Sequence, residues 1–197
     1  MMLLTSSRKP SFKTKILCKK LALFCDAAYM TRGKMSMTEV LERGSGSVLV
    51  VVGEYHGNPG SLTFYDPSGR LFLSLRFSET SFESVPQAEL RYGERIFYGS
   101  PSSVLFSFLN MFMTEGKGLV VPPESLADLF KHTKKEGLPE NEVRAVPWVM
   151  KGSPKPKANE AYIRRLYMQD DRLDFYSNDR LFLRLYVKGI KSDLANH

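Results

Sequence analysis

Basic side chains are concentrated in one short segment near the start of the chain. Between positions 8 and 20 the sequence has no carboxylate and six basic residues: Arg8, Lys9, Lys13, Lys15, Lys19 and Lys20. Arg32 and Lys34 follow on the next predicted turn. Lysine and arginine neutralise phosphates, and a cluster that no carboxylate compensates is harder to explain as an ordinary solvated surface. We therefore interpret these residues as candidate RNA contacts.

The charge of the whole chain is also concentrated in this segment. The net charge is +7 and the isoelectric point is near 9.4. Residues 1–44 hold nine basic and three acidic side chains, a net of +6, whereas the remaining residues hold 19 basic and 18 acidic ones. The basicity is therefore local, as is typical of a binding surface.

The turn from Ser6 to Ser11 separates a short apolar strand from a predicted helix. A helix N-terminus presents free N–H groups and the positive end of the helix dipole, so we expect Arg8 and Lys9 to meet a phosphate there. Lys15 and Lys19 are four residues apart, share one helical face and would follow the RNA backbone. Such contacts position RNA without reading its bases. The alternative is an ordinary capped helix start.

Residues for catalysis or metal binding do not form a recognisable pattern. The three histidines, at positions 56, 132 and 197, are scattered, and no nucleophile, phosphate-loop or metal motif is present. Glu54 and His56 are two residues apart on a predicted strand, which favours a solvated strand end over an acid–base pair. Cys18 and Cys25 are better explained as reduced, semi-buried thiols. We expect no catalytic residue, no metal and no cofactor.

Size and hydrophobicity bound the class of protein. A chain of 197 residues can bury a core without a disulfide or a metal. No apolar run approaches the roughly 18 residues that a transmembrane helix needs, and the first residues lack the order of a signal peptide. We expect a cytoplasmic protein with no membrane partner, folded as one domain.

The predicted elements alternate strands and helices. A helix over Phe12–Cys25, capped by Ser11, places Phe12, Ile16, Leu17, Leu21 and Phe24 on its apolar arc. The β-branched run from Ser47 to Val52 predicts a strand covered on both faces. The other predictions are strands over 2–5 and 27–30, a capped helix over 36–43, a loop over 56–60, a hairpin pairing 62–65 with 70–77, and a connection over 78–94.

A second half repeats this plan. The sequence pattern of this half predicts a strand over 95–98, a turn over 99–103, a helix over 104–113, a strand over 119–121, a helix over 125–135, a strand over 144–150, a loop over 152–159 and strands over 162–187. The segment SLTFYDPSGRLFLSLRF from Ser61 matches RLDFYSNDRLFLRLYV from Arg172, with an offset of 111 residues before the turn and 110 after it. The match predicts a duplicated hairpin, although strand composition alone can produce similar hairpins.

Aromatic residues on these strands have two possible roles. Trp148, Phe64, Tyr65, Phe175 and Tyr176 could stack on bases or fill the core. Adjacent residues on a strand point to opposite faces, so at most one of each neighbouring pair is buried.

The segments LLTSSRKPSFKTK, AYMTRGKMSM and VLVVVGEYHGNPGSLTFYDPSGRLFLSLRF, over residues 3–77, resemble the N-terminal half of Brix-domain proteins, in particular their short archaeal members. The resemblance implies an α/β fold of two similar halves, each with helices on a mixed sheet and a terminal hairpin, like an anticodon-binding domain. We expect one domain over 1–190, with halves over 1–80 and 85–190 and a tail over 191–197.

The resemblance also implies a function and one further contact. It implies a ribosome biogenesis factor whose partners are ribosomal RNA or its precursor and other assembly proteins. Asn58, in the GNPG segment, joins the candidate RNA contacts, and Tyr55 and His56 stand where relatives are expected to carry basic residues. A protein-binding scaffold and a tRNA-binding module remain as alternatives.

Overall fold

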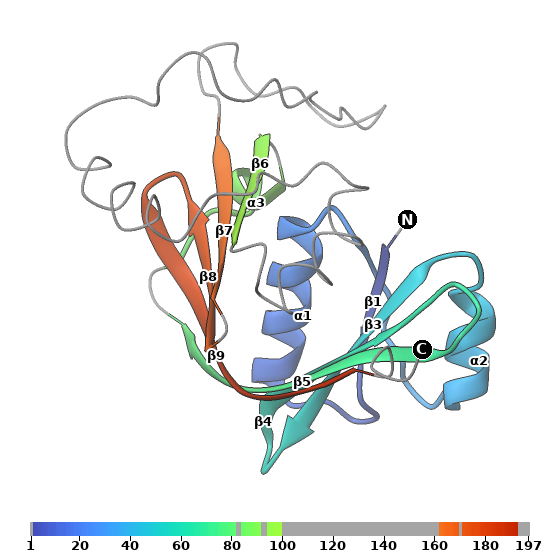
Figure 1. The fold of residues 1–197 in the computed structure, drawn as a ribbon. Coiled ribbons are helices and arrows are strands. Elements are labelled where there is room, and N and C mark those ends of the chain that lie inside the picture. The colour runs from blue at the N-terminus through green and yellow to red at the C-terminus, as the bar shows by residue number, and fades with distance from the viewer. Residues whose placement is uncertain (1, 82–83, 92–93, 100–161, 170, 193–197) are drawn as a thin grey trace. The chain divides into compact units, whose positions relative to one another are not determined.

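The computed structural model describes residues 2–81, 84–91, 94–99, 162–169 and 171–192 (Figure 1). It divides into two compact units, one of Met1–Thr80 with Leu185–His197 and one of Ser81–Arg184. Most of the elements predicted between 99 and 159, together with His132 and Trp148, lie outside the described residues, as does His197.

The first unit alternates strands and helices in the predicted order. Its strand order is β2-β1-β3-β4-β5, in which β1 is parallel to both β2 and β3, and β3, β4 and β5 are antiparallel. The elements are β1 (Met2–Ser6), α1 (Phe12–Phe24), β2 (Ala28–Tyr29), α2 (Met37–Arg43), β3 (Val48–Tyr55), β4 (Asn58–Tyr65) and β5 (Leu71–Ser81).

Local sequence signals explain why these elements begin where they do. Ser11 caps α1 by accepting a hydrogen bond from the Thr14 backbone N–H, and Ser36 with Glu39 forms a capping box at α2. Every residue from Val48 to Val52 is buried, which confirms the prediction of a strand covered on both faces.

The second unit contains one described helix and a set of strands. They are α3 (Gln87–Arg91), β6 (Glu94–Gly99), β7 (Ile163–Gln169), β8 (Arg172–Ser177) and β9 (Arg180–Ser192). The strand order is β6-β7-β8-β9, with β6 parallel to β7 and β7 antiparallel to β8. The last part of β9, from Leu185, is assigned to the first unit.

Both predicted hairpins are confirmed, as β4–β5 and β8–β9. Phe64 and Phe72 lie with ring centroids 6.0 Å apart, and the matching residues Phe175 and Phe182 lie 6.3 Å apart. In each adjacent aromatic pair the phenylalanine is buried and the tyrosine is partly exposed, as strand alternation predicts.

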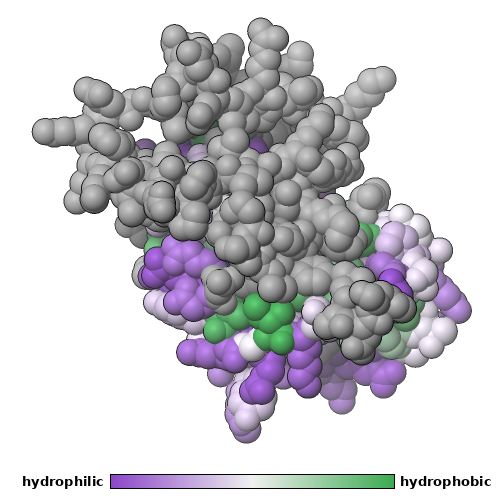
Figure 2. All heavy atoms as spheres, in the orientation of Figure 1, coloured by the Kyte–Doolittle hydropathy of each residue, from purple (hydrophilic) through white to green (hydrophobic). Residues whose placement is uncertain are grey.

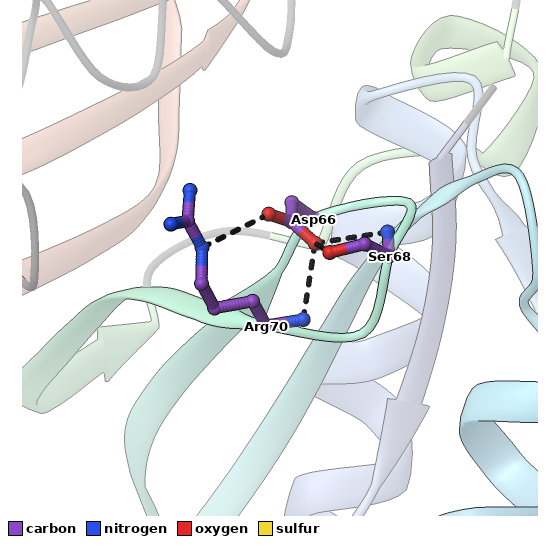
Figure 3. A network of polar contacts seen from close by, with 3 residues as sticks. All are labelled: Asp66, Ser68 and Arg70. Atoms are coloured by element: carbon purple, nitrogen blue, oxygen red, sulfur yellow. Dashed lines mark hydrogen bonds and ion pairs between the residues drawn. The ribbon is translucent and has the colours of Figure 1, made fainter.

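The turn of the first hairpin is closed by Asp66 (Figure 3). Its Oδ1 accepts hydrogen bonds from the Ser68 backbone N–H at 2.9 Å, the Ser68 hydroxyl at 2.5 Å and the Arg70 backbone N–H at 3.0 Å. This is the local bonding that makes aspartate a turn residue, and it confirms the predicted turn.

Two predicted connections are wrong. The loop over 56–60 is a tight turn of His56 and Gly57, both with positive φ, and β4 already begins at Asn58. Asn58, Pro59 and Gly60 have poor strand propensity, but Asn58 and Pro59 pair with β3, and the register shift after Gly53 accommodates Gly60. The connection over 78–94 contains the end of β5, the helix α3 and the start of β6.

Candidate nucleic-acid interface

The predicted basic residues all lie in the first unit. Arg8, Lys9, Lys13, Lys15, Lys19 and Lys34 are exposed, whereas Lys20 and Arg32 are partly buried. Arg32 donates through Nε to the Met35 carbonyl oxygen at 3.2 Å, which gives it a structural contact. Hydrogen bonds from Ser36 are the main cause of the lowered pKa of Glu39, to which the charges of Arg43 and Arg8 also contribute.

The four lysines of α1 differ from the arginines of the second unit. Arg165 pairs with Asp179 at 2.8 Å, Arg184 with Asp174 at 2.5 Å, and Arg180 with Glu89. Among the described residues no ion pair is found for the α1 lysines: Lys13, Lys15, Lys19 and Lys20. Within the described part of the chain, the α1 surface therefore presents positive charge without a carboxylate partner, which an anionic partner can neutralise.

The apolar arc predicted for α1 is partly wrong. Leu17, Leu21 and Phe24 are buried as expected, but Phe12 is 78% exposed and Ile16 is 38% exposed. The buried face is completed instead by Thr14, Cys18 and Ala22. Thr14 can be buried because its hydroxyl has a partner in Glu54, and this rotates Phe12 and Ile16 to the opposite side, among the lysines.

Glu54 binds the start of α1. Its Oε1 accepts hydrogen bonds from the Ser11 backbone N–H at 2.7 Å and from the Thr14 hydroxyl at 2.6 Å. Burial would raise the pKa of Glu54, but these hydrogen bonds outweigh it and lower the pKa. The interpretation of Glu54 as a solvated strand end is therefore wrong. Two donors at the predicted phosphate position are bonded to the protein's own carboxylate.

The β3–β4 hairpin also contacts α1 through a predicted residue. Lys13 Nζ donates to Asn58 Oδ1 at 3.1 Å, and Asn58 Nδ2 donates to the His56 carbonyl oxygen at 3.4 Å. Beside them, Tyr55 is 66% exposed, with its ring centroid 4.2 Å from that of His56. The structure thus brings Lys13 and Asn58 together at the helix start, whereas no described contact joins Arg32 or Lys34 to them.

Other kinds of site are not evident in the described ranges. Cys18 and Cys25 are buried and form no disulfide, and no cluster of three or more potential metal ligands occurs among the described residues. None of the helices described combines the length and the hydrophobicity needed to cross a membrane.

Comparison with known proteins gives sequence relatives and structural neighbours. No family model matches the chain. It is 59% identical over 78 residues to a "Probable Brix domain-containing ribosomal biogenesis protein" of Methanosarcina barkeri, covering 40% of this chain and 50% of that protein. A protein of the same name from Methanosarcina mazei is 50% identical over 84 residues, covering 43% and 54%. The chain thus spans about half the length of the curated relatives it matches.

Two solved structures resemble nearly the whole chain. Mil, an archaeal Imp4-like protein, matches with a TM-score of 0.58 and 20% identity, covering 97% of this chain and 99% of that one. A "probable ribosomal biogenesis protein" from Aeropyrum pernix K1 matches with a TM-score of 0.54 and 17% identity, covering 94% of this chain and 93% of that one. They show that the fold is the α/β fold of Imp4-like proteins. Together the comparisons confirm the resemblance to archaeal Brix-domain proteins that the motifs of residues 3–77 indicate.

Proposed function

We propose that this chain is a ribosome biogenesis factor that binds ribosomal RNA or its precursor through α1. The observation that carries the proposal is the row of exposed lysines on α1 without carboxylate partners among the described residues. The curated relatives are named as ribosomal biogenesis proteins, which supports the same role. The chain acts in the cytoplasm as a binding protein rather than an enzyme.

The proposed RNA contacts are the basic residues that the sequence predicts, but the structure changes how Arg8 and Lys9 can reach a phosphate. Lys15 and Lys19 follow the RNA backbone along one side of α1, and Lys13, held by Asn58, binds it at the helix start from the other side of Phe12 and Ile16. Because Glu54 already binds the helix start, Arg8 and Lys9 meet phosphates through their own side chains rather than together with the free N–H groups of α1. Lys20, Arg32 and Lys34 extend the surface. Other assembly proteins are further partners.

We also propose that the domain arose from two similar halves. The run β1-β3-β4-β5 has a parallel pair followed by antiparallel strands, and β6-β7-β8-β9 begins in the same way. The matched hairpins bury the same positions: Leu62 and Leu173, Phe64 and Phe175, Phe72 and Phe182, and Leu73 and Leu183. This pattern supports the domain over 1–190 with halves over 1–80 and 85–190, and the resemblance to anticodon-binding domains.

Salt dependence tests the function. Neutralising phosphates makes the logarithm of the binding constant fall with the logarithm of salt concentration by about 0.7 per contact on single strands. About four to six contacts give a slope near −3 to −4. Binding of a labelled fragment of small-subunit ribosomal RNA should show such a slope, and an excess of unlabelled tRNA should compete poorly.

Two results would change the proposal. Absence of salt-dependent RNA binding would favour a scaffold that binds only proteins. Preferential binding of tRNA, or its recovery by crosslinking in cells, would favour the tRNA-binding alternative.

A further inference from the structure

The most exposed apolar side chains of the described residues gather at one end of the first unit. The exposed large hydrophobic residues there are Phe12 and Ile16 on α1 and Tyr55 at the end of β3. Figure 2 shows a hydrophobic patch with hydrophilic surface beside it, in the region where Figure 1 places α1. An aromatic ring that is three-quarters exposed contributes little to folding and is available for a ligand.

The two aromatic residues are held in place by contacts between α1 and the hairpin. Glu54, next to Tyr55, binds Ser11, next to Phe12, at 2.7 Å. Lys13 binds Asn58, which is paired with Tyr55 in the sheet. At Gly60 an added Cβ would come within 2.9 Å of the Tyr55 Cβ, so glycine lets β4 pass close behind Tyr55. The rings are therefore attached to a fixed backbone.

Lysines surround this aromatic end. Lys13 follows Phe12 directly, and Lys15 and Lys19 lie beside Ile16 on the exposed side of α1. Exposed aromatic rings next to a row of cations match single-stranded nucleic acid, because bases stack on the rings while lysines bind the intervening phosphates.

We propose that this surface binds unpaired RNA, with bases stacked on Phe12 and Tyr55 and the adjoining phosphates on Lys13, Lys15 and Lys19. This inference rests on the proposed RNA-binding function and adds that the preferred form of the RNA is single-stranded. The rings give affinity for any base, because every base has a face that can stack. A duplex, whose bases are already stacked, gains only the lysine contacts.

The size of the exposed apolar surface favours RNA over a protein partner. A stable protein interface buries roughly 800 Å² on each partner around an apolar centre. Among the described residues, the large apolar side chains exposed here are two aromatic rings and part of Ile16. Lysines lie beside them, which suits single bases better than an apolar protein surface. An acidic amphipathic helix remains the competing ligand for the test.

The test compares a labelled single-stranded oligoadenylate of about 12 nucleotides, a length suited to such sites, with an A-form RNA duplex of the same length. The protein is the full chain and its variants Phe12→Leu, Tyr55→Leu and the double variant. Leucine keeps the apolar volume but removes the aromatic face. Since one stacked base contributes about 1–3 kcal/mol, each single variant should lose about 5- to 150-fold in single-strand affinity. Duplex affinity and the salt slope should be unchanged.

The outcomes separate this inference from the function on which it rests. If the parent protein binds neither RNA in a salt-dependent way, the proposed function fails. If the parent binds RNA but the leucine variants bind the single strand as tightly, the stacking inference alone is overturned. The stacking inference is also overturned if a glutamate-rich amphipathic peptide displaces the single strand and binds the leucine variants with the same affinity as the parent. Circular dichroism melting of each variant verifies that the fold is retained.

Discussion

The Thr14 hydroxyl on α1 donates a hydrogen bond of 2.6 Å to Glu54 Oε1 at the end of β3, 40 residues further along the chain. The same oxygen accepts the Ser11 backbone N–H. This one carboxylate fixes which side of α1 faces the sheet, because Thr14 would be a costly residue to bury without a partner. It thereby determines that the lysines, with Phe12 and Ile16, face outwards.

Glu54→Gln should destabilise the protein by about 1–2 kcal/mol at neutral pH, because hydrogen bonds to a charged acceptor are stronger than those to an amide. The folded-state pKa of Glu54 is lowered from its ordinary 4.5. Its contribution is therefore present above that pH and is lost as the pH falls below it. Urea unfolding measures the free energy of unfolding of the variant and the parent at neutral pH and at about pH 3.5. The difference between these two free energies should be smaller at the acidic pH. Glu42→Gln, an exposed position on α2, is the control, and an equal effect there would contradict the role of Glu54.

Among the ion pairs described in the second unit, loss of the Asp174–Arg184 pair should lower the free energy of unfolding the most. Asp174 is 1% exposed, and its carboxylate receives Arg184 Nε at 2.5 Å and Nη2 at 2.8 Å. Asp174→Asn leaves a partly buried guanidinium without its counter-charge. This variant should lower the free energy of unfolding by about 3–5 kcal/mol. Asp179→Asn is the matched control, since Asp179 also pairs with an arginine but is 76% exposed, and it should cost less than about 1 kcal/mol. Similar losses in the two variants would show that burial does not set the cost.

Phe64→Ala and Phe175→Ala test the equivalence of the two hairpins. Both rings are nearly fully buried and each contacts its own hairpin's second phenylalanine. Each truncation should lower the free energy of unfolding by about 3–5 kcal/mol. Phe12→Ala should leave thermal stability almost unchanged because its ring is exposed. A large loss for one buried phenylalanine and almost none for the other would argue against equivalent cores.

The Cys18 thiol should be inert in the native protein. Burial raises its pKa to about 12, so almost no thiolate, the reactive form, exists near neutral pH. In the variant Cys25→Ala, labelling with a thiol reagent at about pH 8 should wait for unfolding. Fast labelling of the folded variant would mean that Cys18 is accessible.

Much of the fold could be predicted from local sequence signals. The caps at Ser11 and Ser36, the β-branched run of β3 and the Asp66 turn each act over a few residues, so their elements were predicted correctly. The start of β4 could not be predicted from local signals. Asn58 to Gly60 have turn propensity, and this segment becomes part of a strand only through pairing with β3.

The candidate site was predicted less completely, for a similar reason. Charge counting located the lysines, but the orientation of α1 depends on Glu54, a contact across 40 residues. Spacing alone favoured burying Phe12 and Ile16. A polar Thr14 in the middle of the other helical face, with a carboxylate at a strand end, was the one signal for the observed orientation.

The role of α1 as an RNA-binding surface can be tested by the salt dependence of ribosomal RNA binding by the double variant Lys15→Glu with Lys19→Glu. Its matched control is Lys188→Glu with Lys191→Glu, which makes the same charge change at exposed positions of β9. If α1 is the RNA surface, the α1 variant should bind many RNA sequences more weakly. Its salt slope should be shallower by about 1.4, the value for two lost contacts, while the control keeps most of the parent's affinity. Equal RNA binding by the parent and a normally folded α1 variant would show that α1 is not the RNA-binding surface.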